Sequence, residues 1–282
     1  MGVIGTAIRS FYKTIEPLML SLIKMLPDRV LLRIKSRVSV IKRMDYQRGE
    51  IFLHIDSRIE YETRLNSCMK EPETIQWIES YFQEGQVFYD VGANVGAYSL
   101  VASKFLNGNI QVYAFEPGSA TYSQLCKNIN INNFQHTITP LPVALSDTTA
   151  IDVFNYHNLA PGGALHTLGD PIDYKGEVFE PVSTQPVLAY RLDDLIRQFS
   201  LPVPNHIKID VDGIEFKILT GGKETLCNPV VRSLLVELEE STSSLDSILV
   251  FLADMGFEVT SKTENGSTHN YIFHRLPISG DS

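Results

Sequence analysis

Two short stretches of the chain carry residues whose types and spacing could bind a nucleotide-like ligand. In the first, an apolar run at 87–91 contains Asp90 and is followed at once by Gly92-Ala93-Asn94-Val95-Gly96. Glycines let the main chain turn tightly and approach a ligand without interference from a Cβ atom. The apolar residues after Gly96 predict a helix whose N-terminal amides face the same loop. The stretch therefore predicts a strand, a binding loop and a helix, although the loop lacks the dinucleotide spacing G-x-G-x-x-G.

The second stretch is another apolar run, Gln111 to Phe115, which is followed by Glu116. An acid at the end of the second strand of a Rossmann-like unit can accept hydrogen bonds from both hydroxyls of a ribose. Glu116 follows Gly96 by 20 residues, close to the spacing of about 20 expected for such an acid. The loop, the helix and the spaced acid together predict a Rossmann-like α/β fold with a nucleoside site.

Three motifs occur together in this chain: Asp90-Val-Gly-Ala-Asn-Val-Gly96, Phe115-Glu-Pro117 and Ile207-Lys-Ile-Asp-Val-Asp-Gly-Ile-Glu215. They resemble the FkbM-like family of S-adenosylmethionine-dependent methyltransferases, and the similarity covers roughly residues 70 to 275. The resemblance implies an α/β protein with the Rossmann-like class I methyltransferase fold, a seven-stranded, mostly parallel sheet with helices on both faces and a C-terminal antiparallel hairpin. It also implies methyl transfer, usually to a hydroxyl oxygen of a small molecule or sugar. One departure is Asp212, where the family more often has Glu.

The same resemblance indicates where the cofactor and the remaining strands lie. The residues expected to hold S-adenosylmethionine are Asp90, Gly92, Ala93, Asn94, Gly96 and Glu116, with backbone groups near Ala144 facing the adenine. Residues 138–145 are expected to form the third strand, at the edge of the sheet because they contain two prolines. Residues 51–59 predict a strand or hairpin over the sheet, and 257–260 with 271–274 predict the terminal hairpin.

Methyl transfer to a hydroxyl requires that the acceptor oxygen is aligned with the methyl group and loses its proton. Four carboxylates lie at or just after predicted strand ends, the edge at which open α/β sheets bind ligands: Asp210, Asp212, Glu215 and Glu237. Asp210, Glu215 and Glu237 are the candidate catalytic residues, together with His166. Lys208 is expected to point away from them, on the other face of its strand.

These carboxylates allow three interpretations. One could be a general base whose pKa is raised by like-charged neighbours. Two or three could instead hold Mg²⁺, which would bind the acceptor oxygen and favour its alkoxide. A structural alternative has Glu215 capping the helix that starts at Gly213. Our prediction names no metal ligand and leaves the choice between base, metal and capping roles open.

Residues 155–186 form the least regular stretch, rich in Gly, Pro and Asp. A long irregular insertion in a compact domain is often functional. It falls where a class I methyltransferase can elaborate its acceptor pocket, and Tyr156, His157 and His166 are its polar candidates. Each histidine alone is more commonly a surface-loop residue, but the stretch as a whole predicts an acceptor lid.

Length and composition describe an ordinary globular protein with one large core. Of 282 residues, 44% are hydrophobic and 20% charged, and the net charge of -9 argues against general nucleic-acid binding. Residues 1–48 carry ten Lys/Arg against three Asp/Glu, and the remainder carries fourteen against thirty. We therefore expect a basic helical extension at 1–48, a lead-in at 49–84 and a catalytic domain at 85–276. Three scattered cysteines are expected to be reduced thiols.

Residues 1–44 show apolar side chains at helical spacings of three and four, interrupted near Pro17 and stopped near Pro27. Such a helix could rest on an anionic membrane surface. It could also pack on the catalytic domain or on a second copy, as apolar stripes more commonly do. Neither a signal peptide nor a run of about 20 apolar residues is evident. We expect a cytoplasmic protein, with peripheral membrane contact through 1–44 as the alternative.

Two rival functions remain. A methyltransferase-like scaffold without activity is disfavoured because Gly92, Asn94, Gly96 and Glu116 are all present. An NAD(P)-dependent oxidoreductase is disfavoured by the missing G-x-G-x-x-G. The sequence therefore favours an O-methyltransferase that uses S-adenosylmethionine and acts on a small molecule or glycan.

Overall fold

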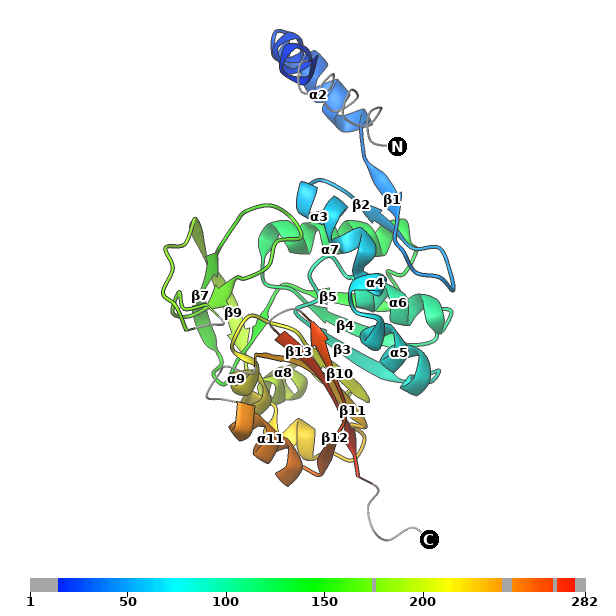
Figure 1. The fold of residues 1–282 in the computed structure, drawn as a ribbon, viewed down its shortest axis with the longest axis vertical. Helices are drawn as coiled ribbons and strands as arrows, with labels where there is room; N and C mark the ends of the chain where they lie inside the picture. Colours follow the sequence, from blue (N-terminus) through cyan, green and yellow to red (C-terminus); the bar gives the residue numbers. More distant parts are fainter. Residues whose placement is uncertain (1–14, 174–175, 240–244, 266–267, 277–282) are drawn as a thin grey trace. The chain divides into compact units, whose positions relative to one another are not determined.

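The chain divides into two compact units, Met1–Val40 and Ile41–Ser282. The computed structural model describes residues 15–173, 176–239, 245–265 and 268–276 (Figure 1). In the first unit, residues 15–24 are helical and α2 spans Asp28–Arg37. The described backbone is therefore helical through Pro17, whereas Pro27 lies between the two helical segments. No helix in the described part of the chain is long and apolar enough to cross a bilayer.

A seven-stranded sheet organises the second unit, with strand order β12-β13-β11-β10-β3-β4-β5 (Figure 1). The bounds in that order are Phe257–Asn265, Thr268–Arg275, Ser233–Glu239, His206–Ile209, Val87–Val91, Gln111–Phe115 and Ile138–Leu141. The five strands from β11 to β5 run parallel, and β13 and β12 are antiparallel additions. This mostly parallel sheet with its terminal hairpin confirms the expected fold class.

Helices cover both faces of this sheet (Figure 1). One face carries α5 (Pro72–Tyr81), α6 (Ala97–Phe105) and α7 (Ser119–Ile131), and the other carries α8 (Leu192–Phe199), α9 (Glu215–Gly221), α10 (Lys223–Cys227) and α11 (Leu245–Asp254). Successive strand residues serve opposite cores, because Phe88 packs with Trp77 and Leu100 whereas Tyr89 packs with Leu192. The carboxyl ends of the parallel strands are thereby held between two packed layers.

The insertion after β5 is more regular than expected. The chain leaves the main sheet after Leu141, at the edge position that the prolines predicted, and forms a second sheet with strand order β6-β9-β7-β8. Its strands are β6 (Ala144–Leu145), β7 (Ala150–Tyr156), β8 (Thr167–Leu168) and β9 (Ser183–Tyr190). Both ends of the predicted irregular stretch 155–186 are therefore strand, because β7 and β9 pair antiparallel over their length.

The lead-in to β3 also contains more structure than expected. β1 (Ile41–Arg43) pairs with β2 (Phe52–His54), and α3 (Arg58–Glu62), the 3-10 helix η1 (Arg64–Asn66) and α4 (Ser67–Lys70) follow. The strand expected at 51–59 ends early because Ser57 and Glu60 form a capping box that starts α3. β2 lies along α7, where side-chain oxygens of Asn128 and Asn132 accept its amide hydrogens. All three cysteines are free.

Candidate active site

The glycine-rich loop between β3 and α6 takes its shape from two left-handed glycines. Gly92 has φ +79°, and a Cβ placed there would lie 1.9 Å from the carbonyl oxygen of Asp210. Gly96 has φ +88°, and its Cβ would lie 2.5 Å from Leu125 Cδ1. Asn94 is also left-handed, with φ +50°, a conformation that asparagine tolerates better than most residues. The loop thus packs tightly against the end of β10 and the side of α7.

Glu116 follows β4 and faces this loop. Its Oε2 accepts the Asn94 amide at 3.0 Å and its Oε1 accepts the Gly118 amide at 2.8 Å. Burial raises the pKa of Glu116 to about 7, although the two amides favour the charged form. Each carboxylate oxygen can accept more than one hydrogen bond. The sequence therefore located an acid that both orders the loop and keeps acceptor capacity for a ligand.

Asp90 lies behind the loop rather than on the cavity surface. It is 1% exposed, and its Oδ2 accepts the amide of Ser99 at 3.1 Å and the hydroxyl of Ser99 at 2.6 Å. Asp90, Ala93 and Gly96 are not among the described residues that line the main cavity, whereas Gly92, Asn94 and Glu116 are. The contacts of Asp90 give it a role in fixing the start of α6.

Asp210 follows β10 and forms an ion pair with Lys208. Burial raises the pKa of Asp210, but the Lys208 ammonium and a hydrogen bond with Glu237 outweigh it and hold the pKa well below its usual range. The expectation that Lys208 points away was wrong. Strand residues two apart share a face, so Lys208 reaches Asp210 even though its side chain is only 1% exposed.

Glu237 lies near the end of β11, and its Oε1 accepts the hydroxyl of Thr268 at 2.7 Å. Burial, the charge of Asp210 and the hydrogen bond to Asp210 raise the pKa of Glu237 to about 9. Near pH 7 the pair is therefore an ionised Asp210 that accepts a hydrogen bond from a protonated Glu237.

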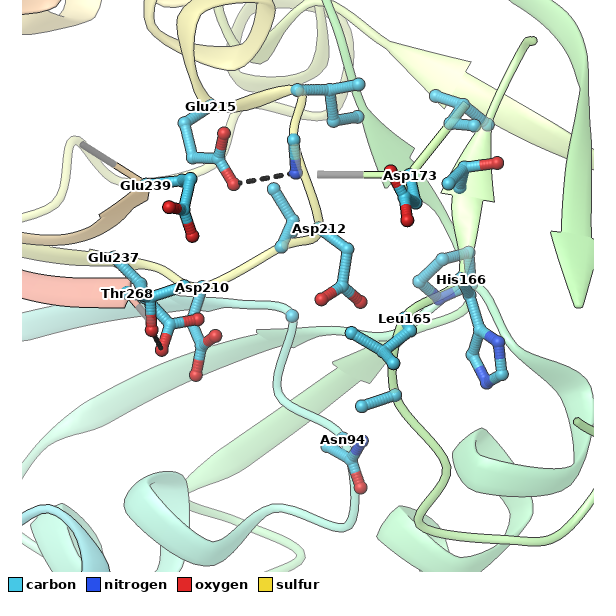
Figure 2. Close-up of a pocket in the computed structure, with 18 of the residues that line it drawn as sticks. Asn94, Leu165, His166, Asp173, Asp210, Asp212, Glu215, Glu237, Glu239 and Thr268 are labelled. Atoms are coloured by element: carbon cyan, nitrogen blue, oxygen red, sulfur yellow. Dashed lines mark hydrogen bonds between the residues drawn. The ribbon is translucent and has the colours of Figure 1, made fainter. Parts of the chain in front are cut away.

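Glu215 begins α9 and bonds back to the loop before it. Its Oε1 accepts the Gly213 amide at 3.0 Å (Figure 2). Burial, with smaller contributions from the charges of Asp212 and Asp210, raises the pKa of Glu215 to about 8. The hydrogen bond to Gly213 supports the capping interpretation, in which the carboxyl group holds the turn between β10 and α9.

Residues 160–166 of the insertion, here called the strap, cross the site. Three successive carbonyl groups of the strap accept hydrogen bonds from side chains of the lead-in and of the glycine-rich loop. Ser57 Oγ donates to Pro161 O at 2.7 Å, Arg64 Nε and Nη2 donate to Gly162 O at 3.0 and 2.8 Å, and Asn94 Nδ2 donates to Gly163 O at 2.7 Å. The strap is thereby tied both to the lead-in and to the glycine-rich loop.

Asp212 joins the strap from the opposite side. Figure 2 shows its carboxylate facing Leu165, and the backbone amides of Leu165 and His166 favour its charged form. Burial and the charge of Asp210 raise the pKa of Asp212 to about 6, while these amides act against the shift. Leu165 has φ +65°, an unusual value for a branched residue, so the strap holds local strain where it meets Asp212.

His166 is the one polar candidate of the insertion that lines the main cavity among the described residues. Its Nδ1 accepts the amide of His157 at 3.1 Å, which places the ring proton on Nε2. Burial lowers the pKa of His166 to about 4. Tyr156 instead accepts the amide of Ser119 and donates to Gln185, so it supports the second sheet.

These groups surround a cavity of about 580 Å³ at the carboxyl ends of β3, β4, β10 and β11 (Figure 2). Eight carboxylates of the described residues line it: Glu116, Asp170, Asp173, Asp210, Asp212, Glu215, Glu237 and Glu239. The cations that line it are Arg64, Lys70 and Lys217. Arg64 and Lys70 come from the lead-in, where no sequence pattern marked them. Their helices are short, and only the tertiary path of the chain brings them to the site.

The residues present fit S-adenosylmethionine. Glu116 provides acceptors for ribose hydroxyls, and the acidic lining suits a sulfonium cation. An adjoining hollow of about 40 Å³ is lined by Phe115, Ala144 and Phe154, apolar surfaces suited to a base. It has room for a few water molecules, so an adenine ring would have to widen it. Among the described residues, no three His, Cys, Asp or Glu side chains are grouped so as to hold a metal ion, and the Mg²⁺ interpretation gains no support.

Comparison with known proteins gives consistent matches. The chain is 26% identical to the hexuronic acid methyltransferase AglP of Haloferax volcanii over 206 residues, 72% of this chain and 77% of that protein. It is 25% identical to the 31-O-demethyl-FK506 methyltransferase FkbM of Streptomyces tacrolimicus, over 64% of this chain and 75% of that one.

Among solved structures, the precorrin-6y C5,15-methyltransferase of Geobacter metallireducens aligns with a TM-score of 0.45 at 14% identity, covering 73% of this chain and 87% of that one. The M. jannaschii TYW2 in complex with AdoMet aligns with a TM-score of 0.43 at 12% identity, covering 84% and 87%. The model of the methyltransferase FkbM domain matches residues 90–259, which is more than half of the sequence. The chain therefore belongs to the FkbM family of S-adenosylmethionine-dependent methyltransferases.

Proposed function

We propose that this methyltransferase methylates an oxygen, with a hydroxyl group of a small molecule or glycan as acceptor and Asp212 as the base. The observation that carries the proposal is the position of Asp212. It lines the same cavity as Glu116 and Asn94, and its pKa of about 6 leaves it ionised at neutral pH yet able to take a proton. S-adenosylmethionine supplies an activated methyl group when bound.

The neighbouring groups have other roles in this proposal. Asp210 is a poor base because the Lys208 ammonium stabilises its charged form. Glu237 is protonated near neutral pH, and Glu215 holds the Gly213 turn. Neutral His166 carries its proton on Nε2, so it can donate a hydrogen bond to an acceptor oxygen. Of the four carboxylates at the ends of β10 and β11 and the start of α9, Asp212 is therefore the one that we assign to receive the hydroxyl proton, while alignment supplies the rest of the rate.

One relative supports an oxygen acceptor, and both support a small molecule or sugar derivative as the acceptor. One is named for transfer to oxygen 31 of a demethylated FK506, and the other for a hexuronic acid, which is a sugar derivative. Both similarities cover most of each chain at about one quarter identity. We carry over the class of atom that is methylated and leave the individual acceptor to experiment.

The test is to incubate the enzyme with S-adenosylmethionine labelled with ¹³C in its methyl group and a panel of neutral sugars, uronic acids and polyketide alcohols. The ¹³C chemical shift of the product separates a methyl ether or ester from an N-methyl or C-methyl group. We expect a methyl ether signal that depends on Asp212. A product methylated only on nitrogen or carbon, or only as the methyl ester of a carboxylate, would overturn the proposal.

A further inference from the structure

Arg64 is a cation that the main chain holds inside the cavity. Its Nε and Nη2 both donate to the carbonyl oxygen of Gly162, and the side chain lines the cavity beside Asn94 and Glu116. Two bonds to one carbonyl fix the plane of the guanidinium group, which has five N–H donors in all. Donors therefore remain for a ligand.

Arg64 forms no ion pair within 4 Å with any described carboxylate, although the cavity is crowded with them. Its charge nevertheless reaches both parts of the site, because it lowers the pKa of Glu116 and of Asp212 against the larger effect of burial. The other lead-in cation of the cavity, Lys70, is paired with Glu71 at 3.2 Å. Arg64 thus presents a positive charge between the loop and the acidic groups without being neutralised by either.

The segment that carries Arg64 is firmly anchored. Glu60 is 1% exposed, and its Oε2 accepts the amides of Asp56 and Ser57 while its Oε1 accepts Gln124 Nε2 from α7. A Cβ on Gly162, the residue that Arg64 grips, would lie 2.7 Å from Glu60 Cγ. The position of the guanidinium group is therefore set before a ligand arrives, which lowers the entropy cost of binding.

We propose that Arg64 binds the α-carboxylate of the methyl donor. S-adenosylmethionine carries one carboxylate, on the amino-acid end of the molecule away from the adenosine that Glu116 would hold by its ribose. A planar guanidinium is the side chain best suited to a carboxylate, and the unpaired charge of Arg64 lies in the same cavity as Glu116. The inference concerns the donor, so it does not depend on the oxygen acceptor proposed above.

The test compares two ligands that differ in the amino-acid end. S-adenosylhomocysteine has the carboxylate, and 5′-methylthioadenosine has the same nucleoside without it. We would titrate both by calorimetry into the full chain, into Arg64→Met and Arg64→Lys, and into Arg58→Met. The last variant removes a charge from the same segment at a residue that is exposed and pairs with Glu62.

We expect Arg64→Met to weaken the binding of S-adenosylhomocysteine about 10- to 100-fold and Arg64→Lys to weaken it less. Neither substitution should change the affinity for methylthioadenosine. Arg58→Met should leave both affinities unchanged. Equal losses for both ligands in Arg64→Met would show a structural role through Gly162 and overturn the proposal. Unchanged binding of S-adenosylhomocysteine to Arg64→Met would also overturn it. If the variant raised only the Michaelis constant of an anionic acceptor, Arg64 would bind the acceptor instead of the donor.

A measurement on the unmodified protein covers the case in which Arg64→Met fails to fold. The methyl ester of S-adenosylhomocysteine lacks the negative charge and keeps the remainder of the molecule. It should bind at least tenfold more weakly than the acid. An ester that binds as tightly as the acid would overturn the assignment, whereas failure of the acceptor panel alone would leave it standing.

Discussion

Asp212 combines an unusual pKa with an unusual set of partners. It lies two residues after Asp210, and two backbone amides of the strap favour its charged form. Burial and the charge of Asp210 nevertheless raise its pKa to about 6. The sequence placed it at the correct strand end but ranked Asp210 above it. Two features distinguish the two acids. The strap amides depend on tertiary contacts and leave no local pattern, whereas the Lys208 ion pair follows from strand periodicity.

The pH dependence of turnover follows from this residue. Because the base must be unprotonated, kcat at saturating donor should fall about tenfold per pH unit below pH 6 and reach a plateau above it. Asp212→Asn should lower kcat by about 10²- to 10⁴-fold and abolish that limb. Initial-rate assays of the wild type and of Asp212→Asn from pH 5 to 9 would measure the two pH profiles of kcat. A variant that keeps the wild-type limb would show that another group is the base.

Glu116 predicts a pH dependence of binding rather than of turnover. A ribose hydroxyl needs the ionised carboxylate as acceptor, and burial raises the pKa of Glu116 to about 7. The Kd for S-adenosylhomocysteine should therefore rise as the pH falls through 7. Glu116→Gln should weaken binding about tenfold at pH 8 and remove most of the pH dependence. Calorimetry at four pH values measures both, and a Kd that does not change with pH would contradict the assigned role.

Among single residues, the spacing of Glu116 from Gly96 predicted its place, because the first and second strands of this fold are adjacent and parallel. Lys208 was misplaced although strand periodicity puts it on the same face as Asp210. Arg64 could not be found at all. Its position results from a capping box, a short helix and a contact with the strap that is 98 residues away in sequence.

At the scale of elements, β3 and β10 can end side by side because residue 92 is a glycine and has no Cβ. Gly92 and Gly85 both have φ +79°, so alanine is strained at either site. A Cβ at Gly85 would have no neighbour within 4 Å, whereas at Gly92 it would lie 1.9 Å from Asp210 O. The pair therefore separates backbone strain from steric overlap.

Gly85→Ala should cost about 1–2 kcal/mol in the free energy of unfolding. Gly92→Ala should cost distinctly more and should also abolish binding of S-adenosylhomocysteine, because Asp210 must shift. Urea unfolding and calorimetry of the two variants would test this. Equal destabilisation would mean that the loop adapts to the Cβ.

The end of β10 contains a buried ionic network. Lys208 is paired with Asp210, and its ammonium lies 4.8 Å from the ring centroid of Tyr98. Burial lowers the pKa of Lys208, but the charges of Asp210, Glu71 and Asp90 outweigh burial and raise that pKa. Removing one partner of such a network leaves the other charge buried.

Lys208→Met should therefore destabilise the protein by about 3–5 kcal/mol. Adding Asp210→Asn should restore part of that loss, because the uncompensated charge is then removed. Urea unfolding of the single and double variants measures the effect. A double variant less stable than Lys208→Met would contradict the view that the single variant is destabilised by the unpaired charge of Asp210.

The elements of the main sheet were predictable because each has a plain pattern: apolar runs, an edge strand marked by prolines and a hairpin signal. The second sheet was not predicted. β9 alternates in burial, but it pairs with β7 across an insertion, and the partner of a strand is a matter of tertiary structure. The lid role of the strap remains a prediction.

At the scale of the whole molecule, all described residues that line the cavity lie in the unit Ile41–Ser282. That unit has its own apolar cores on both faces of the sheet. The first unit, Met1–Val40, is basic, with seven Lys/Arg against two Asp/Glu. The two units therefore have separable chemistry.

A chain that begins at residue 41 should bind S-adenosylhomocysteine with the affinity of the full protein, by calorimetry. The full protein should sediment with vesicles containing phosphatidylserine more than the shortened one, and less so as salt is raised. Equal sedimentation of the two proteins would remove the membrane interpretation of residues 1–44. A shortened chain that loses ligand binding would show that the first unit supports the site.

The position of β13 between β11 and β12 also has a consequence during synthesis. β11, with the sequence SLLVELE, has a permanent partner on one side in β10 and on the other only in residues 268–275. Until those last residues leave the ribosome, β11 is an apolar strand with an open edge, the kind of edge that pairs with other chains. Nascent chains that stop before residue 268 should therefore aggregate, and the need for a chaperone should be greatest between the emergence of residue 239 and that of residue 275 from the ribosome.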